Sequence, residues 1–129
     1  MKVQRKWISI ELPENSTYEL KGADVIATPF GSSGPKLRIM SLKNPDGKSM
    51  KISDLNKYIQ KSLILKKIKI RSGIWSGIDI VCRENESLVT RIWGLISNDL
   101  MVIVSLIGNF SDHEESICEN LVFGISKNA

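Results

Sequence analysis

Residues 68–107 read IKIRSGIWSGIDIVCRENESLVTRIWGLISNDLMVIVSLI, and this stretch decides the fold of the 129-residue chain. Apolar and polar side chains alternate with a period of two over much of residues 68–82, which is typical of β-strands. The clearest interruption is Asn98-Asp99, two residues whose side chains tolerate the left-handed backbone of a tight turn. The stretch therefore predicts consecutive antiparallel strands that are joined by short hairpins.

Within this stretch, the segment from Met101 to Leu106 is apolar at nearly every position. Such a run predicts a central strand that is covered on both faces of its sheet. Ser72-Gly73 and Ser76-Gly77 flank Trp75, where we expect a bend, a bulge or a tight hairpin. Glu84-Asn85-Glu86 is expected to form the next turn.

The first part of the chain predicts shorter strands. The same alternation, with Pro or Gly near the strand ends, places them over residues 7–12, 18–20, 25–28 and 36–42.

Two amphipathic helices complete the predicted architecture. Ser53 is the expected N-cap of the first helix, which apolar residues at helical spacing place over residues 54–65. Asp112 is expected to cap the second helix, with Glu115 three residues later completing a capping box. The sequence thus predicts a single α+β domain over residues 1–129. We expect an α/β sandwich with a central, mostly antiparallel sheet of about six or seven strands, one mid-chain helix and one C-terminal helix.

Five segments, taken in chain order, carry a resemblance to a known family. They are Ile8-Ser9-Ile10-Glu11-Leu12-Pro13, the strand over residues 37–42, Ser53-Asp54-Leu55, the strand over residues 77–82, and the helix end near Ile125-Ser126. Together they resemble the PsbP-like α/β sandwich, which photosystem II extrinsic subunits share with import regulators that bind the GTPase Ran and with bacterial adaptor chaperones. The resemblance implies a domain that binds other proteins, and it carries over no active site.

Composition is that of an ordinary globular domain, with 42% apolar and 25% charged residues. The longest apolar run, residues 100–108, is far shorter than the roughly 20 residues that a membrane-spanning helix needs, so we expect no membrane partner. The basic first residues are followed by no small-residue cleavage site, so we expect a cytoplasmic protein. Cys82 and Cys118 are expected to be buried and reduced, with a disulfide between them as the alternative.

Charge is distributed unevenly along the chain, whose net charge at neutral pH is +4. Residues 1–83 hold sixteen Lys and Arg against seven Asp and Glu, whereas residues 84–129 hold two against seven. This asymmetry indicates either a basic surface for an acidic partner or two oppositely charged halves that face each other within one fold.

No catalytic or metal-binding pattern is recognisable, so we expect a protein that is not an enzyme and binds no metal or cofactor. The residues from Asp112 to Glu115, which include His113, are the one place where a histidine and carboxylates cluster. Acidic residues favour a helix N-terminus on electrostatic grounds, and consecutive helical residues point in different directions. We therefore interpret this cluster as the start of the second helix rather than as a metal or acid–base site.

The strongest functional candidate is a basic strand face. Lys67, Lys69 and Arg71 alternate with apolar residues, and we expect them to share one face with Trp75. Arg91 and Trp93 share one side of a later strand and are expected to lie across from that face.

Cations beside aromatic rings anchor acidic protein surfaces, or bind nucleic acid through phosphate contacts and base stacking. We therefore expect a protein-binding module of the adaptor, chaperone or immunity type, whose partner has an acidic surface. One alternative is a nucleic-acid-binding accessory protein that uses the same face, and another is a domain that binds a small ligand between sheet and helix. Alternating Lys and Ile also occur on any half-exposed strand, which requires no partner.

Overall fold

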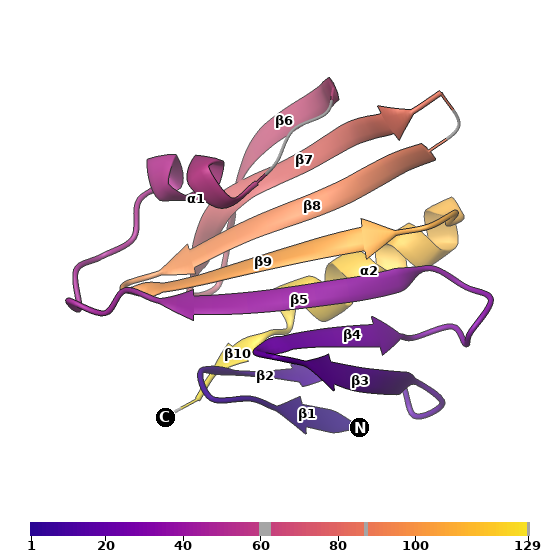
Figure 1. The fold of residues 1–129 in the computed structure, drawn as a ribbon, viewed down its shortest axis with the longest axis horizontal. Coiled ribbons are helices and arrows are strands. Elements are labelled where there is room, and N and C mark those ends of the chain that lie inside the picture. The colour runs from indigo at the N-terminus through magenta and orange to yellow at the C-terminus, as the bar shows by residue number, and fades with distance from the viewer. Residues whose placement is uncertain (60–62, 87, 129) are drawn as a thin grey trace.

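A seven-stranded antiparallel sheet forms the frame of the molecule in the computed structural model, which describes residues 1–59, 63–86 and 88–128 (Figure 1). Its strand order is β3-β4-β5-β9-β8-β7-β6. In that order, the strands span Thr17–Lys21, Asp24–Thr28, Lys36–Lys43, Leu100–Ile107, Leu88–Ser97, Trp75–Asn85 and Leu63–Ser72. The predicted α+β class is confirmed, with seven strands in the main sheet, one mid-chain helix and one C-terminal helix among the described residues.

A second, three-stranded sheet brings the two ends of the chain together. Its strands are β1 (Lys2–Gln4), β2 (Ile8–Glu11) and β10 (Ser126–Lys127), with β2 in the middle. The Asn128 side chain accepts a hydrogen bond of 2.6 Å from the Ser9 hydroxyl, and its amide donates to the carbonyl of Arg5.

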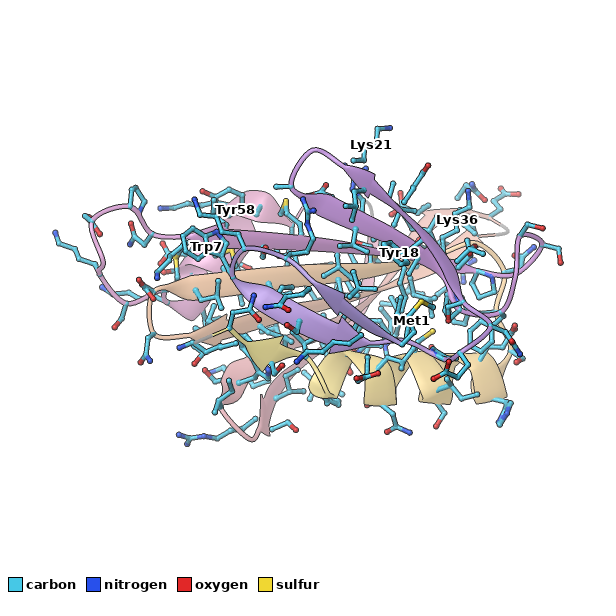
Figure 2. All side chains as sticks on the ribbon, turned by 90° about the horizontal axis from the view of Figure 1, so that it is seen from below. Met1, Trp7, Tyr18, Lys21, Lys36 and Tyr58 are labelled. Carbon is cyan, nitrogen blue, oxygen red and sulfur yellow. The ribbon has the colours of Figure 1, made fainter. Side chains whose placement is uncertain are left out.

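The two helices lie on opposite sides of the main sheet (Figure 2). Helix α2 (Asp112–Phe123) and the small sheet cover one side, which we call the α2 face. Helix α1 (Ile52–Tyr58) covers part of the other side, which we call the α1 face. Each face has its own apolar cluster. The α2 face includes both Trp75 and Trp93, and the α1 face includes Leu55 of α1.

Strand β9 lies between β5 and β8, as expected of a central strand. Val102 and Val104 point into the apolar cluster on the α2 face, and Met101 and Ile103 point into the cluster on the α1 face. All four side chains are buried, so the prediction of a strand covered on both faces is confirmed.

Two tight hairpins connect the long strands. Asn98-Asp99 joins β8 to β9, and Asn98 has a positive φ of 54°, which confirms the predicted turn. Gly73 and Ile74 join β6 to β7, and Gly73 has a φ of 59° that a β-branched or bulky residue would adopt only with strain. The predicted turn at residues 84–86 is wrong in its bounds, because pairing with β8 extends β7 to Asn85.

Helix α1 is shorter than predicted and starts earlier. Its N-cap is Lys51 rather than Ser53, and the Asp54 carboxylate accepts a hydrogen bond from the Lys51 N–H. The helix ends at Tyr58 because Ile59 adopts an extended backbone. Residues 63–65, predicted to continue the helix, belong to β6 instead, and residues 60–62 of that prediction lie outside the described residues. Leu55, Ile59 and Leu63 have helical spacing, but Leu63 begins the edge strand.

Helix α2 also begins one residue earlier than expected. Its N-cap is Ser111, whose hydroxyl accepts a hydrogen bond from the Glu114 N–H at 3.1 Å. The Glu114 carboxylate accepts in turn from the Ser111 N–H, so this pair, rather than Asp112 and Glu115, forms the capping box.

Candidate partner-binding site

The structure separates the six predicted partner-binding residues onto two faces of the sheet. Lys67, Lys69 and Arg71 pair in register with Ile80, Ile78 and Ser76, so their side chains lie on the α1 face. The three other predicted residues, Trp75, Arg91 and Trp93, lie on the α2 face. The expectation that Trp75, Arg91 and Trp93 extend the basic face is therefore wrong.

Both tryptophans are part of the core. Trp75 is 2% exposed and Trp93 is fully buried. The indole Nε1 of Trp75 donates a hydrogen bond of 2.8 Å to the Ile125 carbonyl, which ties β7 to the segment after α2. Trp75, Gly77 and Asp79 are alternate residues of β7, so they project to the same side of the sheet. That side is the covered α2 face. Neither ring is available for base stacking or as an anchor for a partner.

Arg91 is the centre of an internal ion-pair network and is 8% exposed. Its guanidinium donates to both carboxylate oxygens of Asp79, at 2.9 and 2.5 Å, and lies 3.2 Å from Glu115 and 4.0 Å from Glu119. Burial disfavours the charge, but hydrogen bonds and charges from Asp79 and Glu115 outweigh it and raise the pKa of Arg91. Acidic residues of α2 are thus directed at Arg91 and away from the three cations of β6.

Lys67, Lys69 and Arg71 are exposed, and Lys66 is exposed beside them on the same strand. No carboxylate of a described residue lies within 4.0 Å of any of these four cations. The Nζ of Lys67 lies 3.5 Å from the neutral Asn56 side chain of α1. Lys66 precedes Lys67 and pairs with Val81, so its side chain lies on the α2 face, as alternation along the strand predicts. The break in register between Ile64 and Lys66 instead shifts the start of β6, and Ile64 lies on the α1 face.

Strand β6 is an edge of the main sheet, and no strand in the described part of the chain pairs with its outer side (Figure 1). Eight large apolar side chains of the described residues are exposed, and four of them belong to β6 or its turn: Leu63, Leu65, Ile68 and Ile74. We use the term β6 edge for strand Leu63–Ser72 with Ile74, including its outer backbone groups. Long edge strands with exposed apolar side chains tend to pair with further strands.

Two hollows lie on the part of the α1 face that α1 leaves open. The larger, of about 520 Å³, is lined mainly by Met40, Tyr58, Ile59, Ile92, Ile103 and Ser105, with Arg38 and Asp24 at one side. Arg38 donates two hydrogen bonds to one oxygen of Asp24, at 2.9 and 2.7 Å. Strands distant in the sequence form this hollow, so no local motif could have revealed it.

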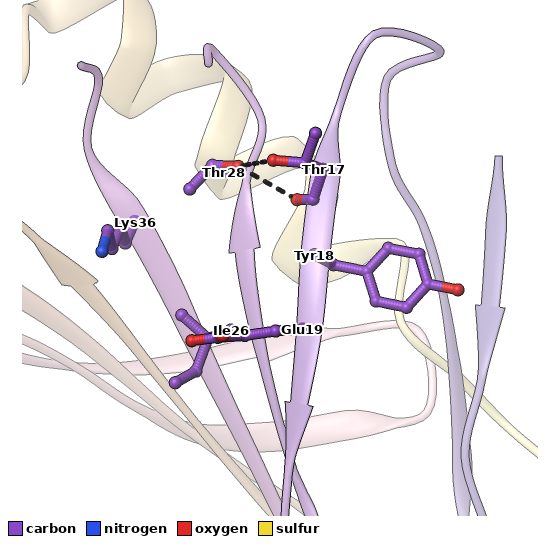
Figure 3. Close-up of a pocket in the computed structure, with 6 residues that line it drawn as sticks. All are labelled: Thr17, Tyr18, Glu19, Ile26, Thr28 and Lys36. Atoms are coloured by element: carbon purple, nitrogen blue, oxygen red, sulfur yellow. Dashed lines mark hydrogen bonds between the residues drawn. The ribbon is translucent and has the colours of Figure 1, made fainter. Parts of the chain in front are cut away.

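The second hollow, of about 290 Å³, lies on β3, β4 and β5 at the outer end of the same face (Figure 3). Thr17 and Thr28 are hydrogen-bonded across the two outer strands. Figure 3 shows the Tyr18 ring pointing away from this contact. The hollow is shallow and lined by few apolar side chains, so it offers little area to enclose a ligand.

The cysteines and the histidine lie apart from one another. Cys82 and Cys118 are buried and free, as predicted, and they belong to the clusters on opposite faces, which excludes the disulfide alternative. Burial, together with the nearby charges of Glu114 and Glu115, raises the pKa of Cys118 to about 12. His113 is exposed, and the described residues contain no group of three metal-ligating side chains.

None of the described helices is long and apolar enough to cross a membrane.

The fold places the chain in the class of α+β proteins with an antiparallel sheet between two helices. No protein-family model and no curated protein matches the sequence. A crystal structure of a protein from Bacteroides thetaiotaomicron VPI-5482 has a similar fold, with a TM-score of 0.65 and 12% sequence identity. The match covers 95% of this chain but 46% of the other, so this chain spans about half the length of that protein. At this identity the similarity concerns the fold alone.

Proposed function

We propose that this chain is a protein-binding module that binds an acidic partner at the β6 edge. The observation that carries the proposal is the row of Lys67, Lys69 and Arg71, exposed on an edge strand with no carboxylate of a described residue beside them. Such a row accelerates encounter with an acidic surface, and Arg71 can bind a carboxylate through two parallel hydrogen bonds.

Apolar side chains on the same strand support this role. Leu63, Leu65 and Ile68 are exposed next to the cations, so a partner that covers them gains apolar burial as well as charge pairing. Interfaces of this kind are held by a few well-buried apolar and Arg contacts, with exposed charges contributing mainly to the association rate.

A role as an adaptor, chaperone or immunity-type protein of PsbP-like fold is in keeping with this surface. The arrangement of a sheet between two helices supports the proposed PsbP-like fold. The two buried free cysteines support a reducing compartment such as the cytoplasm. Nucleic acid is less well supported as the partner, because the tryptophans expected to stack on bases are buried.

The test is charge reversal at the β6 edge. The variant Lys67→Glu/Lys69→Glu/Arg71→Glu is compared with Lys21→Glu/Lys36→Glu/Lys48→Glu, which changes the net charge equally at exposed positions elsewhere. Each protein is used to capture partners from nuclease-treated lysate of the source organism, and bound proteins are identified by mass spectrometry. We expect an acidic protein that binds the wild type and the control but not the β6 variant. Equal capture by all three would refute the proposal.

A second candidate function is small-ligand binding in the hollow beside α1. Its floor contains Ile92 and Ile103, and the polar groups at its side are the Ser105 hydroxyl and the Arg38–Asp24 ion pair, so an apolar ligand with one polar end fits its chemistry. Thermal denaturation with medium-chain fatty acids tests this function. A rise in Tm that Ser105→Trp abolishes is the expected result, and unchanged Tm values rule it out.

A further inference from the structure

We propose that the partner contributes an extended acidic segment, which adds to the β6 edge as an eighth antiparallel strand of the main sheet. This inference rests on the proposed function and specifies the form and the sequence pattern of the partner. It follows from the directions of the backbone groups and side chains of β6.

The hairpin between β6 and β7 fixes the directions of the backbone groups. Ser72 pairs with Trp75 across the two-residue turn that begins at Gly73. In a two-residue hairpin the closing pair exchanges both of its hydrogen bonds, and bonded and non-bonded pairs then alternate along an antiparallel ladder. Ser72, Ile70 and Ile68 therefore bond to β7.

The intervening residues Arg71, Lys69 and Lys67 occupy the non-bonded positions of this ladder, opposite Ser76, Ile78 and Ile80. Their N–H and C=O groups point away from β7, toward the open side of the edge. The same three residues thus supply both the free backbone groups and the unpaired positive charges.

An added antiparallel strand would place one residue directly opposite each of these three cations. Directly opposed residues project to the same face, so those partner residues would lie beside Lys67, Lys69 and Arg71 on the α1 face. The intervening partner residues would lie beside Ile68 and Ile70 on the α2 face. The favoured partner sequence therefore alternates acidic and apolar residues over at least five positions.

A second copy of this chain does not meet this requirement. Two β6 strands paired with each other would bring like charges together, which opposes their association. The other edge of the sheet, β3, reads Thr-Tyr-Glu-Leu-Lys and carries one acid and one cation on its α1 face, Glu19 and Lys21. The charge pattern of β6 is thus complementary to an acidic strand from another protein.

The test uses a defined peptide with the full chain. The probe is acetyl-Ser-Glu-Val-Glu-Val-Glu-Val-Ser-amide, and a second peptide of the same composition has its three glutamates in one block. Two further versions carry N-methyl groups on all glutamate amides or on all valine amides. In the proposed antiparallel pairing the glutamate N–H groups face β6 and the valine N–H groups face solvent.

We expect the probe and its N-methyl-valine version to bind with similar affinity, measured by fluorescence anisotropy. N-methylation of the glutamates should weaken binding by about tenfold or more, because three backbone hydrogen bonds are lost. In the wild-type chain, binding should slow amide exchange about tenfold at Lys67, Lys69 and Arg71, while Ile68 and Ile70 are already protected by β7.

Equal binding of the alternating, blocked and N-methyl-glutamate peptides would overturn strand addition. If Lys67→Glu/Lys69→Glu/Arg71→Glu still abolished that binding, the proposed acidic-partner function would stand without this geometry. If the triple variant instead bound all the peptides as the wild type does, both proposals would fail.

Discussion

The stability of the main sheet depends on side chains of its central strand, β9. Val104 is fully buried on the α2 face, where the small sheet and α2 cover it. Ile107 ends the same strand but is 42% exposed. Replacing each of these two residues by Asp therefore compares a buried and an exposed position of the same strand.

We predict that Val104→Asp abolishes folding, because an unpaired carboxylate in this cluster costs several kcal/mol. Ile107→Asp should lower the free energy of unfolding by no more than about 1 kcal/mol, as expected for an exposed site. Circular dichroism and urea denaturation measure both. A cooperatively unfolding Val104→Asp protein would show that the site is not enclosed.

Arg91 allows a second comparison at this scale. Arg91→Ala leaves Asp79 and Glu115 without their cation in a largely buried site, and we predict a loss of about 3–5 kcal/mol in unfolding free energy. Arg38→Ala removes a pair whose arginine side chain is 48% exposed, and its cost should be about 0–1 kcal/mol. Similar costs for the two variants in urea denaturation would contradict the internal role of Arg91.

Burial of the Cys118 thiol makes the free energy of unfolding depend on pH. Its folded pKa of about 12 lies above the ordinary value of 9.0, so the native state keeps a proton that the unfolded chain loses. The resulting stabilisation is complete below pH 9 and is lost as the pH rises toward about 12, at up to about 1.4 kcal/mol per pH unit.

We predict that the wild type loses more stability between pH 9 and 10.5 than Cys118→Ala does, measured by urea denaturation at each pH. Comparing the two proteins cancels the contribution of lysines that titrate in the same range. Parallel pH profiles would contradict a buried, protonated thiol.

At the scale of the elements, alternation and turn residues predicted most of the architecture. The 101–106 strand, the Asn98-Asp99 hairpin and the presence of one mid-chain and one C-terminal helix follow directly from local pattern, whereas the short strand β10 after α2 was not predicted. The end of α1 could not be predicted in this way. Ile59 and Leu63 have helical spacing, but the backbone is already extended at Ile59.

The candidate site was predicted only in part, for a specific reason. Alternation along β6 correctly placed Lys67, Lys69 and Arg71 on one face. The alternation of β6 does not continue through the Gly73-Ile74 turn, because Ser72 pairs with Trp75 and the two project to the same face. Trp75 was therefore assigned to the wrong face. Local pattern also cannot show that β6 is an edge strand, because strand order depends on contacts between distant segments.

An edge strand of this kind tolerates charge changes well. We predict that Lys67→Glu/Lys69→Glu/Arg71→Glu unfolds within a few degrees of the wild-type Tm, since all three side chains are exposed and bind no carboxylate of a described residue. Differential scanning calorimetry measures the shift. A large fall in Tm would mean that these cations have structural partners within the chain.

At the scale of the whole molecule, the uneven charge of the sequence has two explanations in the fold. Part of it is internal, because Arg91 from the sheet binds Glu115 and Glu119 of the acidic α2. The cations of β6 are not neutralised in this way, and they lie on an exposed edge with apolar neighbours. Part of the surplus positive charge therefore lies where a further strand can pair.

The most direct test of this account is to map where an acidic strand binds the whole chain. Isotope-labelled protein is titrated with the alternating Glu-Val peptide, and backbone amide shifts are followed by NMR. We predict that the perturbed residues run along β6 from Lys66 to Ser72 and into β7, leaving α2 and the hollow beside α1 unchanged. Perturbations centred on Met40, Ile103 and Ser105, with β6 unaffected, would contradict the account and place the binding site in that hollow.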